Sequence, residues 1–192
     1  MHHFFAYISK LKYIIRWGLK RNVEDENVKE HSFDVAVIAH ALSVIKNQYF
    51  GGRLNVDQVG MIALYHDASE VLTGDLPSPI KYFNPAIAEA YKAVEKAAEN
   101  KLLTMLPNEM QRDFLRLIDH QSVDKEVVDI VKSADIISAY LKCIHEVQAG
   151  NNEFIVAKER VEELLKSIAL PEVSYFLEKF VPSFRLTLDE LG

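Results

Sequence analysis

The sequence has little of several features that mark other classes of protein. It contains one cysteine, Cys143, in 192 residues, so no disulfide can form within the chain. We expect this thiol to be packed in the core, and we expect a reducing compartment. No apolar run approaches the roughly 18 to 20 residues of a membrane span, and the amino-terminal segment has no signal-peptide pattern. The sequence therefore predicts a cytoplasmic protein that has no membrane partner.

Clustered positive charge is also missing. The formal net charge is −6 and there is no basic block, which argues against binding of a nucleic-acid polymer through its phosphates. A single nucleotide remains compatible with this charge, because one or two well-placed cations can bind it. Hydrophobic residues make up 49% and charged residues 26% of the chain, a globular composition, and the length suits one domain over residues 1–192.

The sequence has no internal repeat and no alternating apolar and polar pattern of strand length. Apolar residues recur instead at helical spacing, which predicts an all-α fold. The expected helices run from Phe4 to about Trp17-Gly18, from a cap at Asn27 to about Gln48, from a cap at Asn55 or Asp57 through Leu72, from Asn84-Pro85 to about Leu106, around 110–118, over 124–149 and over 154–168, with one short helix after Pro171. The polar loop 119–122 places His120 in solvent.

One stretch of the third expected helix concentrates chemically active groups. His66 and Glu70 are one helical turn apart, and Asp67 is next to His66, within an otherwise apolar run. A buried carboxylate without a partner is costly, so it takes up a proton or recruits a cation. The alternative is an amphipathic helix whose polar stripe holds these residues, and a lone His-Asp pair would favour it.

Two other expected helices supply further ligands. His31 lies on the same buried stripe as Val35 and Ile38, whereas His40, nine positions later, should face away. Asp135 lies on the buried stripe of the helix over 124–149 and should point into the core. A satisfied core histidine is the alternative for His31 alone. Together, two imidazoles and two carboxylates suit a single divalent transition metal, with coordination positions left for water and substrate.

These residues also carry a family resemblance. The order His31, then His66-Asp67, then Asp135 resembles the signature of the HD-domain metal-dependent phosphohydrolases, in an all-α helical bundle with core motifs over about 27–150. Along nearly its whole length the chain is similar to the bacterial HD-domain 5′-deoxynucleotidases of the YfbR type. The matching segments are Arg16-Trp17, Asn27-Val28 to His31-Ser32, Tyr65 to Pro77, Ala134-Asp135 and Gly150 to Phe154.

The resemblance implies hydrolysis of deoxyribonucleoside 5′-monophosphates to deoxynucleoside and phosphate, with little activity on ribonucleotides, by a homodimer. It implies one divalent cation held by His31, His66, Asp67 and Asp135. Cobalt, manganese, copper, nickel and zinc are all candidates, and the sequence does not rank them. It also implies catalytic roles for Glu70, Asp75 and Arg16.

The substrate contacts that the resemblance implies come from several segments. They are Arg16, Trp17, His31, Asp67, Asp75, Leu76, Pro77, Ser78 and Asp135. Arg16 would orient the phosphate, while Trp17 and the turn over 75–78 would contact the nucleoside. Ser78 departs from the threonine that is frequent in close relatives, but it keeps the hydroxyl. Our hypothesis for the choice of sugar is that Trp17 packs against the 2′ carbon.

The expected chemistry is coherent. A phosphomonoester dianion needs positive charge, which the metal and Arg16 supply, and a divalent cation lowers the pKa of a bound water. Glu70 can handle the proton of that water or of the leaving 5′ oxygen. Asp75 could equally bond a sugar hydroxyl.

Two other functions remain open from the sequence. One keeps the HD site but acts on a cyclic nucleotide or a nucleoside triphosphate; the presence of only one well-placed arginine argues against a triphosphate. The other is a non-catalytic signalling module derived from such enzymes. Degenerate relatives lose metal ligands, whereas this chain has all four together with Glu70.

Overall fold

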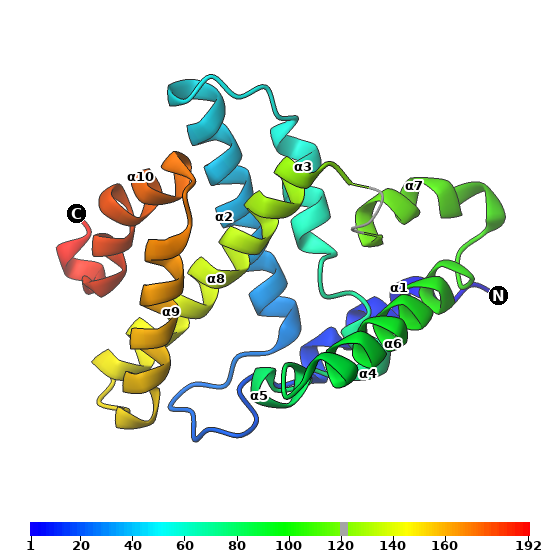
Figure 1. Cartoon of the computed structure of the whole chain (residues 1–192), viewed down its shortest axis with the longest axis horizontal. Coiled ribbons are helices and arrows are strands. Elements are labelled where there is room, and N and C mark those ends of the chain that lie inside the picture. Colours follow the sequence, from blue (N-terminus) through cyan, green and yellow to red (C-terminus); the bar gives the residue numbers. More distant parts are fainter. Residues whose placement is uncertain (120–122) are drawn as a thin grey trace.

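The computed structural model of the chain describes residues 1–119 and 123–192 (Figure 1). Within these ranges the regular structure is helical, apart from one isolated antiparallel bridge between Ile15 and Asn27. The expected all-α fold class is therefore confirmed. His120, expected in an exposed loop, lies outside the described residues. No helix in the described ranges is both long enough and apolar enough to cross a membrane.

Most of the helices follow one another with short connections, but residues 14–27 form a longer loop between η1 and α2. The first part contains α1 (Phe4–Ile8), the 3₁₀ helix η1 (Ser9–Tyr13), α2 (Val28–Tyr49) and α3 (Val56–Leu64). The middle contains α4 (Glu70–Thr73), α5 (Ser78–Lys81), α6 (Pro85–Leu103) and α7 (Asn108–Ile118). The last part contains α8 (Lys125–Gln148), η3 (Asn152–Phe154), α9 (Ile155–Ser167), α10 (Pro171–Lys179), η4 (Val181–Arg185) and η5 (Leu188–Glu190).

Helices α2, α3 and α8 form the centre of the molecule. In Figure 1, α3 lies on one side of α2 and α10 on the other, and the long helix α8 runs obliquely past α2. The apolar stripe expected on α2 is buried, with Val35 and Leu42 fully inaccessible, and it packs against Ile137 of α8. Each side chain of this size contributes about 1.5–3 kcal/mol on burial. This packing brings the start of α2 and the middle of α8 together.

A second apolar cluster lies among α1, α6 and α7. Its buried members are Phe4, Ala68, Leu102, Leu103, Leu106 and Ile118. Ala68 belongs to the turn that follows α3, so this cluster anchors the residues next to His66 and Asp67. The two clusters therefore hold the same turn from opposite ends.

The helix starts follow the expected capping chemistry. The Asn27 side chain accepts hydrogen bonds from the backbone N–H groups of Lys29 and Glu30, at 3.1 and 3.0 Å. Asn55, and not Asp57, caps α3, because its side chain accepts from the N–H of Gln58 at 3.1 Å. Asn84 caps α6 in the same way. These asparagines satisfy N–H groups that have no partner within the helix.

The expected first helix is wrong in extent. The α-helix ends at Ile8 and the 3₁₀ helix that follows ends at Tyr13, whereas the prediction continued to Trp17-Gly18. Ile15, expected on the buried stripe, is 44% exposed. The backbone forms a short bridge instead, in which the N–H of Arg16 donates to the carbonyl of Glu26 at 2.8 Å. The β-branched pair at 14–15 favours this extended conformation.

The central helix is also interrupted. Helix α3 ends at Leu64, residues 65–69 form turns, and the short helix α4 begins at Glu70. The ring Nδ1 of His66 lies 2.7 Å from the carbonyl of Ala63, which in a continuous helix would accept from the N–H of Asp67. The sequence pattern predicts His66 and Glu70 on one face of a continuous helix. This prediction is wrong, because the helix is interrupted between them.

The segments on either side of α6 differ from expectation in smaller ways. Helix α6 ends at Leu103, and bonds from Met105 to Leu102 and from Leu106 to Leu103 close the chain in tighter turns. Helix α5 begins at Ser78, inside the expected break after Asp75. Helix α8 agrees with its expected bounds, and His40 is exposed as predicted.

Candidate metal centre

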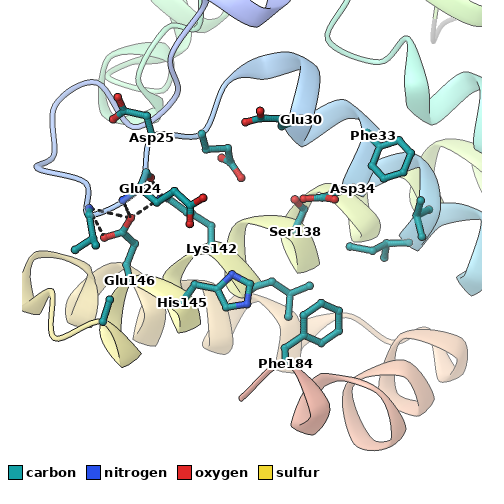
Figure 2. Close-up of a pocket in the computed structure, with 16 residues that line it drawn as sticks. Glu24, Asp25, Glu30, Phe33, Asp34, Ser138, Lys142, His145, Glu146 and Phe184 are labelled. Atoms are coloured by element: carbon teal, nitrogen blue, oxygen red, sulfur yellow. Dashed lines mark hydrogen bonds and ion pairs between the residues drawn. The ribbon is translucent and has the colours of Figure 1, made fainter. Parts of the chain in front are cut away.

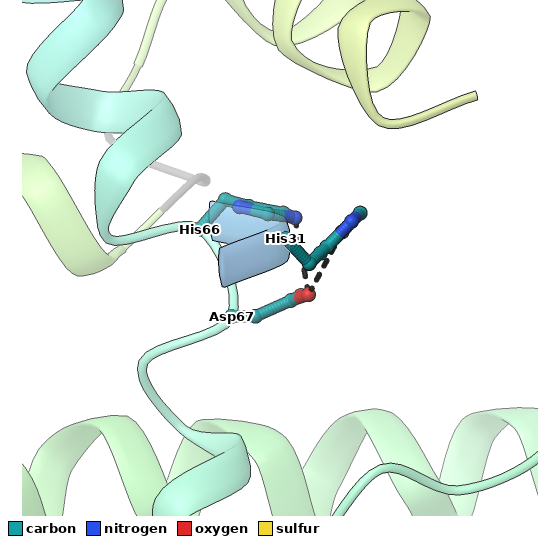
Figure 3. A group of neighbouring side chains, drawn as sticks. All are labelled: His31, His66 and Asp67. Carbon is teal, nitrogen blue, oxygen red and sulfur yellow. Dashed lines mark ion pairs between the residues drawn. The ribbon is translucent and has the colours of Figure 1, made fainter. Parts of the chain in front are cut away.

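His31, His66 and Asp67 form a tight cluster where the start of α2 meets the turn after α3 (Figure 3). One potential ligand atom from each residue lies within 4.8 Å of the other two. Asp67 Oδ2 is 3.1 Å from His66 Nε2 and 3.5 Å from His31 Nε2. The interruption of the central helix therefore turns Asp67 toward the imidazole of α2.

The ring nitrogens on the far side of the two imidazoles have their own partners. His66 Nδ1 donates to the carbonyl of Ala63 at 2.7 Å, so in the neutral ring Nε2 carries the lone pair that faces Asp67. His31 Nδ1 is 3.2 Å from the hydroxyl of Ser138 on α8. Such contacts orient metal-binding histidines in proteins. Two Nε2 atoms beside a carboxylate are a donor set that fits a divalent transition metal.

Asp135 adds a second carboxylate to this cluster. Its Oδ1 lies 3.1 Å from His31 Nε2, so α8 contributes to the same site as α2 and the turn after α3. The prediction that Asp135 points into the core is confirmed only in part, since its carboxylate reaches the buried His31 while its side chain stays 42% exposed. His31 is fully buried, so the cluster has a closed side at α2 and an open side at α8. The open side is where water and a substrate can reach it.

The charges within the cluster depend on one another. Burial opposes ionisation of Asp67, but the adjacent His66, His31 and Arg16 hold the pKa of Asp67 far below its usual range. For Asp135, burial is again outweighed, and the neighbouring His31 lowers the pKa. Burial alone would lower the pKa of His66, but the adjacent Asp67 raises this pKa to about 9. The imidazoles, and for Asp67 also Arg16, therefore favour the ionised forms of both carboxylates.

The pKa of Glu70 is raised, in contrast to those of Asp67 and Asp135. The residue is 8% exposed at the start of α4, and burial, with the charges of Asp67 and Asp75, raises the pKa of Glu70 to about 9. A carboxyl group with such a pKa holds a proton at neutral pH. Perturbation of this size, beside a candidate metal site, is typical of groups that transfer protons.

Asp75 and the turn after it follow the short helix α4. Burial raises the pKa of Asp75, and its charge interacts with those of Arg16, Asp67 and His31. No direct contact joins Asp75 to the cluster of His31, His66 and Asp67 within the described part of the chain. Residues Leu76 and Pro77 are half-buried, and Ser78 is exposed at the first position of α5. Of this turn, Asp75 is the residue whose charge interacts with the cluster.

Arg16 connects the cluster to the amino-terminal loop. Its Nη1 is 3.5 Å from Asp67 Oδ2, and its Nε donates to Glu26 Oε2 at 3.0 Å. Trp17 follows it with a positive φ of 58°, and its ring packs 5.3 Å from that of Phe154. The guanidinium has five N–H groups, so donors remain for a ligand. Of the predicted pair, Arg16 contacts the cluster directly, whereas Trp17 packs on Phe154 and donates to Glu26.

Comparison with known proteins adds an independent observation. The sequence matches a family model described as 5′-deoxynucleotidase YfbR-like over residues 3–184. The chain belongs to this family. A 5′-deoxynucleotidase of Yersinia pestis (strain Pestoides F) is 56% identical to it over 192 residues, covering 100% of this chain and 98% of the relative. A 5′-deoxynucleotidase of Yersinia pseudotuberculosis (serotype IB, strain PB1/+) matches with the same identity and coverage.

Solved structures resemble the YfbR-like fold as well. An HD-domain phosphohydrolase from Listeria innocua has a TM-score of 0.82 and 24% identity, covering 95% of this chain and 88% of that one. The HD phosphohydrolase of cyanophage S-2L, bound to dA and one catalytic Zn²⁺, has a TM-score of 0.65 and 20% identity, covering 93% and 96%. At these identities the likeness is one of fold.

The loop that carries Arg16 in this YfbR-like chain is hydrogen-bonded to the C-terminal end of α8. Glu146, 2% exposed, accepts hydrogen bonds from the backbone N–H of Val23 at 2.9 Å and of Glu24 at 3.3 Å. Asn151 donates to the same carboxylate at 2.7 Å, and Lys142 at 2.5 Å. Lys142 also donates to the carbonyl of Glu24. A buried charge with this many donors is a firm anchor for the loop.

A cavity of about 430 Å³ lies between this loop, α2 and α8 (Figure 2). Its wall includes the carboxylates of Glu24, Asp25, Glu26, Glu30 and Asp34. Lys142 and His145 also line the cavity, but the carboxylates outnumber them, so a phosphate dianion is disfavoured there.

Sequence reasoning missed three residues that shape the site, namely Glu26, Ser138 and Glu146. A signal for the last two exists on α8, because Asp135, Ser138, Lys142 and Glu146 are spaced by three, four and four residues and share one helical face. This polar stripe runs from the metal cluster to the loop anchor. Glu26 had no such signal, since it lies in a loop just before the cap of α2.

The anchor predicts a dependence of stability on pH. Burial opposes ionisation of Glu146, but the bonds from Lys142, Asn151 and the backbone lower its pKa to about 2. The unfolded carboxyl has a pKa of about 4.3, so between these values the unfolded state binds more protons. The stabilisation is complete above about pH 5 and is lost as the pH falls toward 2.

We therefore expect the unfolding free energy of the parent protein to exceed that of Glu146→Gln at pH 7, by an amount that shrinks on acidification. Denaturant unfolding from pH 7 to pH 3 measures this difference. Glu24→Gln, an exposed carboxylate on the same loop, is the matched control and should change stability by only a few tenths of a kcal/mol. A difference for Glu146→Gln that stays constant with pH would contradict this account.

Proposed function

We propose that this chain is a metal-dependent 5′-deoxynucleotidase, which hydrolyses deoxyribonucleoside 5′-monophosphates to deoxynucleoside and phosphate. The observation that carries the proposal is the cluster of His31, His66 and Asp67, with the guanidinium of Arg16 at its edge. Full-length relatives at 56% identity are named for this activity. The cyanophage protein, bound to dA and one catalytic Zn²⁺, supports a single cation beside a deoxynucleoside.

The proposed ligands of the cation are His31, His66, Asp67 and Asp135. Their donor atoms converge from α2, the turn after α3, and α8, and the open side at Asp135 leaves room for water and phosphate. A divalent cation held there would polarise the phosphate and lower the pKa of a water molecule. Cobalt, manganese, copper, nickel and zinc all suit mixed imidazole and carboxylate donors, so availability decides occupancy.

The remaining residues are proposed to hold the substrate and to move protons. Arg16, fixed at Nε by Glu26, presents its terminal N–H groups to the phosphate oxygens. Glu70, with its pKa raised to about 9, can donate a proton to the leaving 5′ oxygen. Asp75, at the outer edge, can bond a sugar hydroxyl or assist the proton transfer. The turn formed by Leu76, Pro77 and Ser78 would contact the nucleoside.

A screen of phosphate release tests the proposal. Deoxyribonucleoside 5′-monophosphates should be hydrolysed, whereas 5′-triphosphates and cyclic nucleotides should be poor substrates, because Arg16 is the one arginine seen at the cluster in the described part of the chain. Preferential release from a triphosphate or a cyclic nucleotide would favour another HD activity. Absence of turnover with stoichiometric metal would favour a signalling module.

The proposal also covers the domain organisation, the oligomeric state and the cellular location. The chain is proposed to act as one domain over 1–192, as a homodimer, in the cytoplasm. The side chains of Phe33 and Val37 on α2 are 62% and 53% exposed, which supports burial against a second copy. The single cysteine, Cys143, is buried and free, as a reducing compartment allows. Light scattering of the pure protein tests the dimer, and cell fractionation tests the location.

Asp135→Ala is expected to abolish both metal retention and activity. The change removes an anionic donor at the open side of the cluster, so a cation would be held by His31, His66 and Asp67 alone. Mass spectrometry of the metal content, on protein without a histidine tag, measures the loss. A variant that keeps one metal ion per chain would remove Asp135 from the ligand set.

Glu70→Ala is expected to keep the metal and to lose turnover. Glu70 is proposed to transfer protons without binding the metal. Its removal should therefore lower kcat by roughly 10² to 10⁴, while KM changes little. Steady-state kinetics alongside metal analysis separates the two effects. Parallel loss of metal would instead make Glu70 a ligand.

The preference for deoxyribose is proposed to depend on Trp17. An apolar wall rejects an added hydroxyl by only about 10²-fold in comparable pockets, so steric crowding and loss of water at the 2′ position must contribute. Trp17→Ala should narrow the ratio of deoxy to ribo activity mainly by raising ribonucleotide turnover. Arg16→Ala should weaken both substrates in parallel. An unchanged ratio in Trp17→Ala would mean that the 75–78 turn selects the sugar.

A further inference from the structure

Glu26 contacts both residues that are proposed to bind the nucleotide from the amino-terminal loop. Its Oε2 atom accepts from Arg16 Nε and from Trp17 Nε1, each at 3.0 Å. Its backbone carbonyl also accepts from the N–H of Arg16, at 2.8 Å. The side chains of Glu26 and Arg16 are 12% and 13% exposed. One oxygen atom therefore fixes the separation between a guanidinium and an indole.

The backbone around this contact is strained, which shows that the arrangement is strongly determined. Trp17 has a φ of 58°, in a region that a bulky residue rarely adopts. Its surroundings hold it there through the ring of Phe154, the bond from its indole to Glu26, and a turn in which the N–H of Lys20 donates to its carbonyl at 2.8 Å. Loss of the Glu26 bond would leave the indole free to move.

We propose that Glu26 is a positioning residue for substrate affinity and sugar selectivity. It orients Arg16 by its Nε edge, so that Nη1 faces Asp67 at the metal cluster, and it sets the distance from there to the face of Trp17. A nucleotide phosphate and a deoxyribose are a fixed distance apart, so both contacts can form at once only while this spacing is kept. The inference rests on the proposed function.

The charge of Glu26 alone would have the opposite effect. A carboxylate beside Arg16 weakens the attraction of the site for phosphate, so its removal should tighten binding if charge were its main influence. A positioning role predicts weaker binding when the carboxylate is removed or shortened. The direction of the change in KM therefore distinguishes the two roles.

Three variants separate length from charge. Glu26→Ala removes the carboxylate, Glu26→Asp keeps its charge but reaches one methylene less far, and Glu26→Gln keeps its length without charge. Asp25→Ala, which removes an exposed carboxylate one residue away, is the matched control. For each, we would measure KM, kcat, the ratio of deoxy to ribo activity, the metal content and the thermal midpoint.

We expect Glu26→Ala to raise KM for deoxyribonucleoside monophosphates by roughly 10- to 100-fold, the range for loss of a charged hydrogen bond, with a smaller change in kcat. The ratio of deoxy to ribo activity should narrow, while metal content stays at the parental value. Glu26→Asp should behave like a milder Glu26→Ala, and Glu26→Gln should retain more of the parental KM than Glu26→Asp. Asp25→Ala should match the parent.

Trp17 is the only tryptophan of the chain, which supplies a readout that needs no catalysis. In Glu26→Ala and Glu26→Asp, its fluorescence should shift to longer wavelength and become more accessible to acrylamide. If the parent hydrolyses no deoxynucleotide, the proposed function fails, while this optical test still decides whether Glu26 places Trp17. Parental fluorescence in both variants, or a KM that stays equal or falls in Glu26→Asp, would overturn the inference.

Discussion

The site depends on two ionised carboxylates held around one buried imidazole. Asp67 and Asp135 approach His31 Nε2 to 3.5 and 3.1 Å, from different segments of the chain. Both carboxylates have lowered pKa values, because the adjacent imidazoles, and for Asp67 also Arg16, favour their ionised forms. Helices α2, α3 and α8 pack around an apolar core that holds these groups together. The same packing that stabilises the fold therefore assembles imidazole and carboxylate donors that fit a divalent cation.

A second layer of structure controls what that cation can act on. Residues 23–26 of the loop line the acidic cavity of Figure 2, Arg16 contacts Asp67 of the cluster, and the buried carboxylate of Glu146 accepts hydrogen bonds from the loop backbone. Glu26 contacts Arg16 and Trp17 together. The polar face of α8 links these parts, since Asp135 and Glu146 lie on it three turns apart. Fold stability and substrate placement thus share one helix.

Much of the fold could be predicted, because helical spacing and capping are local. The bounds of α8 and the caps at Asn27 and Asn84 follow directly from side-chain types and their spacing. The break after Leu64 did not follow, because periodicity records which side chains are apolar. Periodicity gives no information on the hydrogen bond that the ring of His66 donates to the carbonyl of Ala63. A local contact of the side chain with the backbone decided that turn.

The sequence predicted the cluster of the candidate site but not its exposure or the contacts of the loop. The convergence of His31, His66 and Asp67 follows from inward-facing positions and from the family resemblance, and the structure brings them together. The exposure of Asp135 did not follow, since a buried stripe gives no information on where a cleft opens beside it. Glu26 was missed for a related reason, because its importance comes from contacts across a loop, which no spacing rule encodes.

The central claim is that one divalent cation, held by this cluster, carries the activity. Its most direct test is a titration of metal-free protein, without a histidine tag, in which bound metal and hydrolysis of a deoxyribonucleoside 5′-monophosphate are measured together. The account predicts that activity rises in proportion to bound metal and saturates at one ion per chain. Full activity of the metal-free protein, or activity that appears only with a second ion, would contradict it.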